Sequence, residues 1–271
     1  MDPRMGSVLI PGIPEEDLPG KLIVLEGTDG VGRSTQMRLL RNWLESSGLA
    51  VYDTGLSRGR LAGSHIQRAK DGHTMGKRTQ ALFYATDFAD RLEREILPAM
   101  RAGYVVLTDR YVYSLMARAI VRGMEAPWVR KLYAFAPTPD IVLYMKISVD
   151  RLLPRVLASG GFDYWESGMD YRRETTLYDA FVKHQGALLE QFALLAKEHN
   201  FSVVNAEEPI RDVFDDLQGR VEDVVTDMVE AQQMSDFVAP ILPDASKEDA
   251  EDHHTIADSL RDLLSSFLED S

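Results

Sequence analysis

Residues 27–35 read GTDGVGRST, and this stretch decides which fold the rest of the chain has to build. It follows the pattern of a phosphate-binding loop, G-x-x-x-x-G-K-[ST], except that Arg33 stands at the lysine position. Glycines let the backbone curl so that successive N–H groups point at phosphate oxygens, and a following helix adds the positive end of its dipole. The stretch therefore predicts a phosphate-binding turn between a strand and a helix.

The flanks of this loop provide the strand and the helix. Residues 21–27, KLIVLEG, read as a buried strand, and residues 34–48 have helical apolar spacing that stops at a glycine. Further strand-like runs, each followed by a helical pattern, occur at 49–54, 103–109, 139–147 and 201–206. This alternation predicts an α/β fold of the P-loop NTPase type, a three-layer arrangement with a five-stranded parallel sheet and helices on both faces. Ligands bind outside the carboxyl ends of such strands, where both the loop and Asp109 fall.

The loop and Asp109 carry the predicted donor chemistry. Arg33 can bind phosphate through its guanidinium, Ser34 can place its hydroxyl on Mg²⁺, and Asp109 can orient the metal from the end of its strand. We predict that nucleotide phosphates bind along the whole loop, with Mg²⁺ at Ser34 and Asp109; the loop residues are Gly27, Thr28, Asp29, Gly30, Val31, Gly32, Arg33, Ser34 and Thr35. Three alternatives remain open: an ordinary glycine turn, a loop that binds nucleotide without transfer because of Arg33, and an Asp109 that only caps a turn.

Four blocks in order resemble the thymidylate kinase family. Residues 22–36 (LIVLEGTDGVGRSTQ) resemble the family's strand, loop and helix, and residues 81–117 resemble its acceptor helix and the following Asp-Arg-Tyr strand. Residues 162–171 (FDYWESGMDY) resemble the lid, and residues 203–217 the last strand and helix. The resemblance covers about residues 20–225 and implies transfer of a phosphoryl group from ATP to a nucleoside monophosphate, with dTMP as the first expectation.

The resemblance also implies residue roles. The catalytic residues would be Arg33, Asp109 and Asp29, with Asp29 facing the acceptor sugar and phosphate. Arg110 would bind the acceptor phosphate, and Phe83 would stack on the base unless it belongs to the helix core. The predicted acceptor-binding set is completed by Arg58, Asp87, Tyr111, Ser114, Arg118 and Trp165.

Several positions depart from the family pattern. Arg58, or its neighbour Arg60, would contact phosphate out of register, and residues 158–170 of the lid contain no Lys or Arg. Asp87 stands where we expect an arginine that reads a thymine carbonyl, and Arg118 where a pocket-lining apolar residue is usual. A carboxylate only accepts hydrogen bonds, so these two residues leave a guanine nucleotide open as the acceptor. Alternatively, Asp87 pairs with Arg118 or with Arg91 and reads no base.

Composition separates the chain into three parts. The formal net charge is −13, of which residues 226–271 contribute −10 through 12 acidic and 2 basic residues. We predict a leader over 1–19, a kinase-like domain over 20–225 and an acidic C-terminal extension over 226–271 with an amphipathic helix at 255–270. The apolar stripe of that helix needs to be buried against the body of the protein, a second subunit in a homodimer, or a partner.

The same composition excludes some classes of protein. The nearly neutral main domain argues against a nucleic-acid surface, and no apolar run reaches the roughly 18 residues that span a bilayer. The chain has no cysteine, and its N-terminus lacks the features of a secretion signal, so we expect a cytoplasmic protein. The alternative to an enzyme is a nucleotide-binding regulatory protein that acts through its acidic tail.

Overall fold

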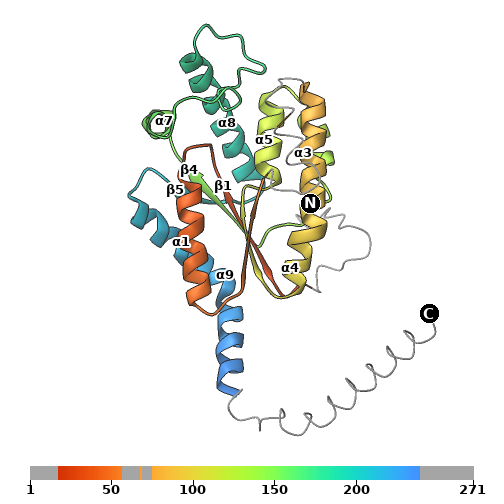
Figure 1. Cartoon of the computed structure of the whole chain (residues 1–271), viewed down its shortest axis with the longest axis vertical. Helices are drawn as coiled ribbons and strands as arrows, with labels where there is room; N and C mark the ends of the chain where they lie inside the picture. The colour runs from red at the N-terminus through yellow and green to blue at the C-terminus, as the bar shows by residue number, and fades with distance from the viewer. Residues whose placement is uncertain (1–17, 57–67, 69–74, 239–271) are drawn as a thin grey trace, which may run out of the picture. The chain divides into compact units, whose positions relative to one another are not determined.

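The computed structural model describes residues 18–56, 68 and 75–238 (Figure 1). These residues contain the predicted five-stranded sheet, in which every neighbouring pair of strands is parallel and the order is β2-β3-β1-β4-β5. The strands are β1 (Lys21–Glu26), β2 (Val51–Gly55), β3 (Val105–Asp109), β4 (Ile141–Lys146) and β5 (Ser202–Asn205). The prediction of an α/β fold of the P-loop type is confirmed.

Helices cover both faces of the sheet. They are α1 (Arg33–Ser46), α3 (Lys77–Arg91), the π-helical segment η2 (Leu92–Ile96), α4 (Leu97–Arg101), α5 (Val112–Val121), α6 (Ala126–Leu132), α7 (Val149–Ala158), α8 (Leu177–Glu198) and α9 (Ile210–Val238). Figure 1 shows α1 and the start of α9 on one side of the sheet and α3, α4 and α5 on the other. None of the described helices combines the length and the apolarity that a membrane crossing needs.

The central strand explains why two helical layers form. Leu22, Ile23, Val24 and Leu25 are all fully buried. Successive side chains of a strand point to opposite faces, so a continuous apolar run needs cover on both sides. Leu22 and Val24 belong to the core that α3, α5 and α8 complete. The strand therefore fixes the position of the loop that follows it.

The helix predicted over 79–100 is continuous from Lys77 to Arg101 but changes its winding in the middle. Pro98 lies at the start of α4 and has no N–H, so the carbonyl four residues earlier loses its usual partner. The preceding turn, η2, is π-helical, a winding that adds one residue to the turn and relieves this conflict.

The carboxyl ends of three strands meet at one edge of the sheet. In the parallel register, Leu25 of β1 and Gly55 of β2 both pair with Asp109 of β3. The loop after β1 and the carboxylate that ends β3 are therefore neighbours, as predicted.

The chain divides into two units, residues 1–227 and 228–271. The first contains the sheet and its helices. Of the second, the structure describes residues 228–238, which are helical. Most of the predicted leader and the predicted helix at 255–270 lie outside the described residues.

Candidate active site

The glycine-rich loop joins β1 to α1 at the carboxyl edge of the sheet. Gly30 and Gly32 have φ angles of 78° and 107°, a region that favours glycine. Gly30 has a second constraint, because a Cβ there would lie 2.7 Å from Val156 of α7. Gly32 is the N-cap of α1, and no side chain among the described residues caps that end. The first N–H groups of α1 are thus left for a ligand.

Two cavities open from different sides of this loop. Gly30, Arg33 and Ser34 line a cavity of about 630 Å³ together with Asp109, and we call it the loop cavity. Val31, Gly32 and Thr35 line a cavity of about 380 Å³ that the start of α9 closes, and we call it the α9 cavity. The loop therefore presents some residues to each side of the helix start.

Arg33 is buried and points back into its own loop. Its Nη1 donates to the carbonyl of Gly27 at 2.6 Å and to the carbonyl of Thr28, and its Nε donates to Asp109 Oδ1 at 2.6 Å. Arg33 thus joins the loop to the end of β3, and two of the predicted catalytic residues are in direct contact.

Asp29 holds two guanidinium groups at once. One carboxylate oxygen accepts from Nη2 of Arg110, and the other accepts from Nη2 of Arg118 at 2.6 Å. Burial, and then the cation of Arg118, lower the pKa of Arg110 to about 9. Arg110 also has a φ of 70°, a strained conformation for a residue with a side chain. Two adjacent cations on one carboxylate suit an anionic ligand.

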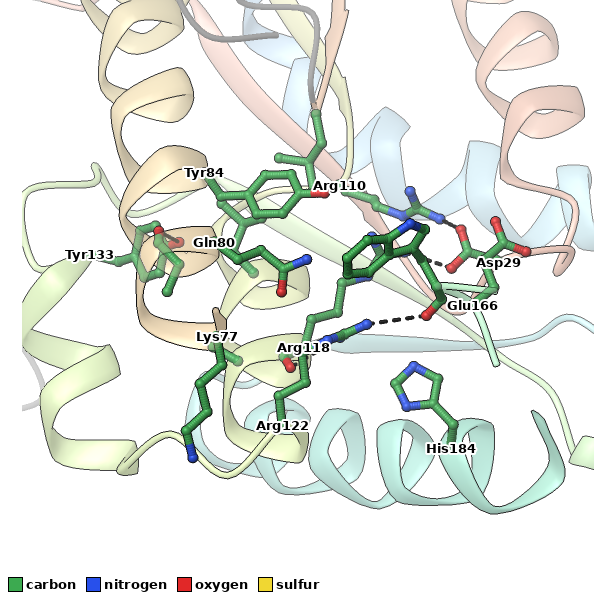
Figure 2. A pocket seen from close by; sticks show the side chains of 15 residues that line it. Asp29, Lys77, Gln80, Tyr84, Arg110, Arg118, Arg122, Tyr133, Glu166 and His184 are labelled. Atoms are coloured by element: carbon green, nitrogen blue, oxygen red, sulfur yellow. Dashed lines mark hydrogen bonds and ion pairs between the residues drawn. The ribbon is translucent and has the colours of Figure 1, made fainter. Parts of the chain in front are cut away.

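A third cavity, of about 240 Å³, lies between α3 and α5, and we call it the α3–α5 cavity (Figure 2). One side of α3 forms its wall through Lys77, Gln80, Ala81 and Tyr84, a spacing that places them on one helical face. Asp29, Arg110 and Glu166 line both this cavity and the loop cavity. The two cavities therefore adjoin at the Asp29–Arg110 pair.

Phe83 and Asp87 of α3 are not among these wall residues. The aromatic residue of α3 that lines the α3–α5 cavity is Tyr84. Phe83 is 37% exposed, whereas Asp87 is fully buried and forms an ion pair with Arg91 at 3.6 Å. Phe83 is rotated by about 100° from Tyr84, and Asp87 lies one turn beyond Tyr84 along the helix. The ion pair of the open alternative, Asp87 with Arg91, is therefore present in the structure.

Tyr111 and Ser114 make hydrogen bonds inside the fold. The Tyr111 hydroxyl donates to the carbonyl of Pro137 at 2.9 Å. Glu26 accepts from the backbone N–H groups of Tyr111 and Ser114 and from the Ser114 hydroxyl, so its carboxylate caps the start of α5. Burial raises the pKa of Glu26, and these hydrogen bonds oppose that shift. Neither Tyr111 nor Ser114 lines the α3–α5 cavity.

The segment between α7 and α8 reaches both adjoining cavities. Trp165 and Glu166 line the α3–α5 cavity, as predicted for Trp165. Arg122, the C-cap of α5, holds this segment through Asp170, at 2.7 and 3.1 Å, and through the carbonyl of Trp165 at 3.1 Å. Arg58 lies outside the described residues.

His184 of α8 is a cavity residue that sequence reasoning missed. It lines the α3–α5 cavity and is 2% exposed. Its surroundings come from α5 and the 162–172 segment, which are remote in sequence, so a lone histidine in a helical pattern carries no signal of this kind.

The residues predicted to hold Mg²⁺ are compatible with that ion. Ser34 and Asp109 line the same loop cavity. Within the described part of the chain, no group of three or more His, Cys, Asp or Glu residues could hold a metal alone. Mg²⁺ in phosphate-transfer sites takes one or two protein ligands and completes its shell with substrate phosphates and water, which this pair would permit.

Comparison with known proteins agrees with these features. A family model described as thymidylate kinase matches residues 25–217. The chain is 37% identical over 201 residues to a probable thymidylate kinase 2 of Saccharolobus solfataricus, covering 73% of this chain and 94% of that protein. It is 31% identical over 204 residues to a probable thymidylate kinase of Pyrococcus abyssi, with the same coverage. A thymidylate kinase of Desulfotalea psychrophila is 35% identical over 144 residues, 53% of this chain and 71% of that protein.

Proposed function

The chain belongs to the thymidylate kinase family, and on that premise we propose how it transfers the γ-phosphoryl group of ATP to dTMP. It is a phosphotransferase. The observation that carries the assignment of sites is the junction of the loop cavity and the α3–α5 cavity at Asp29, Arg110 and Glu166. A donor in one and an acceptor in the other would bring their phosphates together at that junction.

The donor would bind along the glycine-rich loop. Its phosphates would lie in the loop cavity against the N–H groups that begin α1, with Ser34 and Asp109 holding Mg²⁺. The α9 cavity would accept the nucleoside end of ATP, because Val31, Gly32 and Thr35 of the same loop line it. Mg²⁺, when bound, would neutralise charge on the β- and γ-phosphates.

Arg33 would then change partners. Nearby phosphates offer its guanidinium stronger acceptors than backbone carbonyls. Movement of Arg33 away from Asp109 would free that carboxylate for Mg²⁺. The ion pair at 2.6 Å would thus hold the site together until the donor arrives.

The acceptor would bind in the α3–α5 cavity with its base near Tyr84 and its phosphate at Arg110 and Arg118. Tyr84 takes the stacking role first assigned to Phe83, because its ring lines the wall. Asp29 already holds both arginines, which keeps them side by side for a dianionic phosphate. An oxygen of that phosphate would attack the γ-phosphorus while its bond to the β–γ bridging oxygen breaks and ADP leaves.

The protein's contribution to this step is positioning and charge neutralisation. Arg110 and Arg118 contact Asp29 at the cavity junction, and Arg33 lines the loop cavity, whereas Arg155 donates to the carbonyls of Val31 and Ala206. We assign the neutralisation of transition-state charge to Arg33, Arg110 and Arg118. Closure of the 162–172 segment would exclude water and so limit hydrolysis of ATP.

The alternatives are not favoured. The guanine hypothesis depended on Asp87 reading a base edge, and Asp87 is instead paired with Arg91 outside the cavity wall. The regulatory hypothesis depended on weak catalysis, and turnover tests it. The cytoplasmic location, a homodimer and a partner for the C-terminal helix remain proposals.

A coupled assay of ADP release tests the function with dTMP, dUMP, dCMP, dGMP and GMP as acceptors. We expect dTMP to give the highest kcat/KM. Asp109→Asn serves as the catalytic control, and its transfer rate should fall by roughly 10²-fold, the scale of removing one electrostatic stabiliser. Nucleotide binding without turnover for every acceptor would replace the kinase by the regulatory alternative.

A further inference from the structure

We propose that His184 is a fixed hydrogen-bond donor that recognises the carbonyl oxygen at the 4-position of the acceptor base, and so selects thymine or uracil over cytosine. The proposal rests on the proposed function, because it concerns the acceptor of that reaction. It assigns a specificity role to a residue on α8, across the cavity from the α3 wall.

The place of His184 favours contact with the nucleoside rather than with the phosphate. Its side chain lines the α3–α5 cavity but not the loop cavity, and unlike Arg110 and Arg118 it is not held by Asp29 at the junction where the phosphates would meet. Figure 2 shows the imidazole rising from α8 toward the space beside Arg118 and Glu166, with Gln80 and Tyr84 across from it on α3. A base near Tyr84 would therefore have one edge toward His184.

The hydrogen bonds around the ring determine its tautomer. Tyr171 Oη lies 2.8 Å from His184 Nδ1 and also accepts from Nε of Arg172 at 3.1 Å. A guanidinium only donates, so the Tyr171 hydroxyl hydrogen stays available, and we assign it to Nδ1 of the histidine. Nδ1 is then the acceptor, and a neutral ring carries its hydrogen on Nε2.

The ring stays neutral for a clear physical reason. Burial, together with the cations of Arg122, Arg118 and Arg172, lowers the pKa of His184 to about 3. A neutral Nε2–H donates one hydrogen bond and accepts none, and unlike an amide it cannot reverse its polarity by rotating.

The ring is also held in place. A Cβ at Gly168 would lie 2.8 Å from Nδ1, so this glycine lets the 162–172 segment pack directly on the imidazole. The Tyr171 ring contacts the guanidinium groups of Arg122 and Arg172, with centroid distances of 5.5 and 5.3 Å. The donor is therefore preorganised before any ligand binds.

The chemistry of the bases selects the partner. Thymine and uracil have an accepting oxygen at the 4-position, whereas cytosine has a donating amino group there. Gln80 also lines the cavity and is 8% exposed, but its carboxamide can rotate to match either ring. A donor of fixed polarity such as His184 can tell them apart, because it would face another donor on cytosine.

Kinetics with dTMP and dCMP test the proposal on the full chain. His184→Leu should raise KM for dTMP by roughly tenfold, the scale of one hydrogen bond, and should lower the dTMP-to-dCMP ratio of kcat/KM by a similar factor. His184→Gln keeps an N–H donor, so its KM for dTMP should lie between the values of wild type and His184→Leu. Its dTMP-to-dCMP ratio of kcat/KM should stay closer to that of His184→Leu. His199→Gln is the matched control, because His199 ends α8 and packs on Tyr113 and Phe201 instead.

The ¹⁵N spectrum of the His184 ring is a measurement independent of activity. Its signals are assigned as those that disappear in His184→Gln. We expect the Nε2–H tautomer in wild type and a mixture of tautomers in Tyr171→Phe, with a higher KM for dTMP in that variant. An Nδ1–H tautomer in wild type overturns the proposal. So does an equal loss of dTMP and dCMP activity in His184→Leu, whereas absent turnover in wild type would instead contradict the proposed function.

Discussion

At the scale of single residues, Arg33 poses the sharpest question, because it replaces a lysine and is already occupied. Its guanidinium contacts two carbonyls of the loop and Asp109. A lysine would offer a compact charge with fewer fixed directions, whereas arginine is a planar fork that bridges several acceptors. Arg33 can therefore hold the loop in place without a ligand. When ATP binds, contacts to its phosphates have to replace those that Arg33 makes to the loop carbonyls and to Asp109.

We predict opposite effects for two substitutions of Arg33. Arg33→Ala removes the cation and should abolish transfer and weaken ATP binding. Arg33→Lys keeps the charge, releases the loop carbonyls and should retain or raise kcat. Isothermal titration with ATP and steady-state kinetics measure both. An unchanged rate in Arg33→Ala would show that the loop is not the donor site.

The lowered pKa of His184 also predicts how the free energy of unfolding depends on pH. Its pKa is about 3 in the folded state and near 6.5 when exposed, so below pH 6.5 the unfolded chain binds a proton that the folded chain does not. The stabilisation is therefore present above pH 6.5 and is lost as the pH falls, by roughly 1.4 kcal/mol per unit.

Urea unfolding of wild type and His184→Gln at pH 7.5 and pH 5 measures this contribution. The variant should lose less stability than wild type on acidification, by about 2 kcal/mol over the 1.5 units below pH 6.5. Equal losses in the two proteins would mean that His184 is protonated in the folded state.

At the scale of elements, α3 shows what a sequence can and cannot tell. The helix itself is predictable, because the helical spacing of its apolar residues is a local property of the sequence. Which residues face the cavity depends on the rotation of the helix about its axis, and α5 and the core settle that through Phe88 and Tyr111. A one-residue error in this phase exchanges Phe83 for Tyr84 at the cavity wall. The same holds for Glu26, whose role as the cap of α5 joins residues more than 80 positions apart.

The buried pair Asp87–Arg91 should hold α3 against β2. Both side chains are fully buried, and Arg91 Nη1 also donates to the Thr54 hydroxyl at 3.4 Å. Asp87→Ala leaves a buried cation without this partner and should cost about 3–5 kcal/mol of unfolding free energy.

The double variant Asp87→Leu with Arg91→Met removes both charges, and it should be closer to wild type than Asp87→Ala is. Chemical denaturation measures the three proteins. The order of preference among acceptors should not change in the double variant, and a selective loss of dGMP activity relative to dTMP would return Asp87 to the base site.

At the scale of the whole molecule, the first unit accounts for the kinase. The family model ends at residue 217, and the first unit extends to Asp227. The parallel sheet was predictable because fully apolar strands alternate with helices, whereas the cavity walls were not, since they join α3, α5, α8 and the 162–172 segment. The acidic extension contributes most of the net charge, and no residue that lines the cavities described above belongs to it.

A chain that ends at Asp227 should therefore keep both activity and fold. It retains Val213, Leu217, Val221 and Val225 of α9, which are buried, and the ion pair of Asp227 with Lys21 at 3.3 Å. We expect the same kcat and KM for dTMP as the full chain and a melting temperature within a few degrees of it.

If the extension joins two subunits, sedimentation should show a lower mass per particle after truncation. If it binds a partner instead, the mass should fall only by that of the removed residues. A large loss of melting temperature would show that the extension completes the core, which would make the boundary at residue 227 wrong.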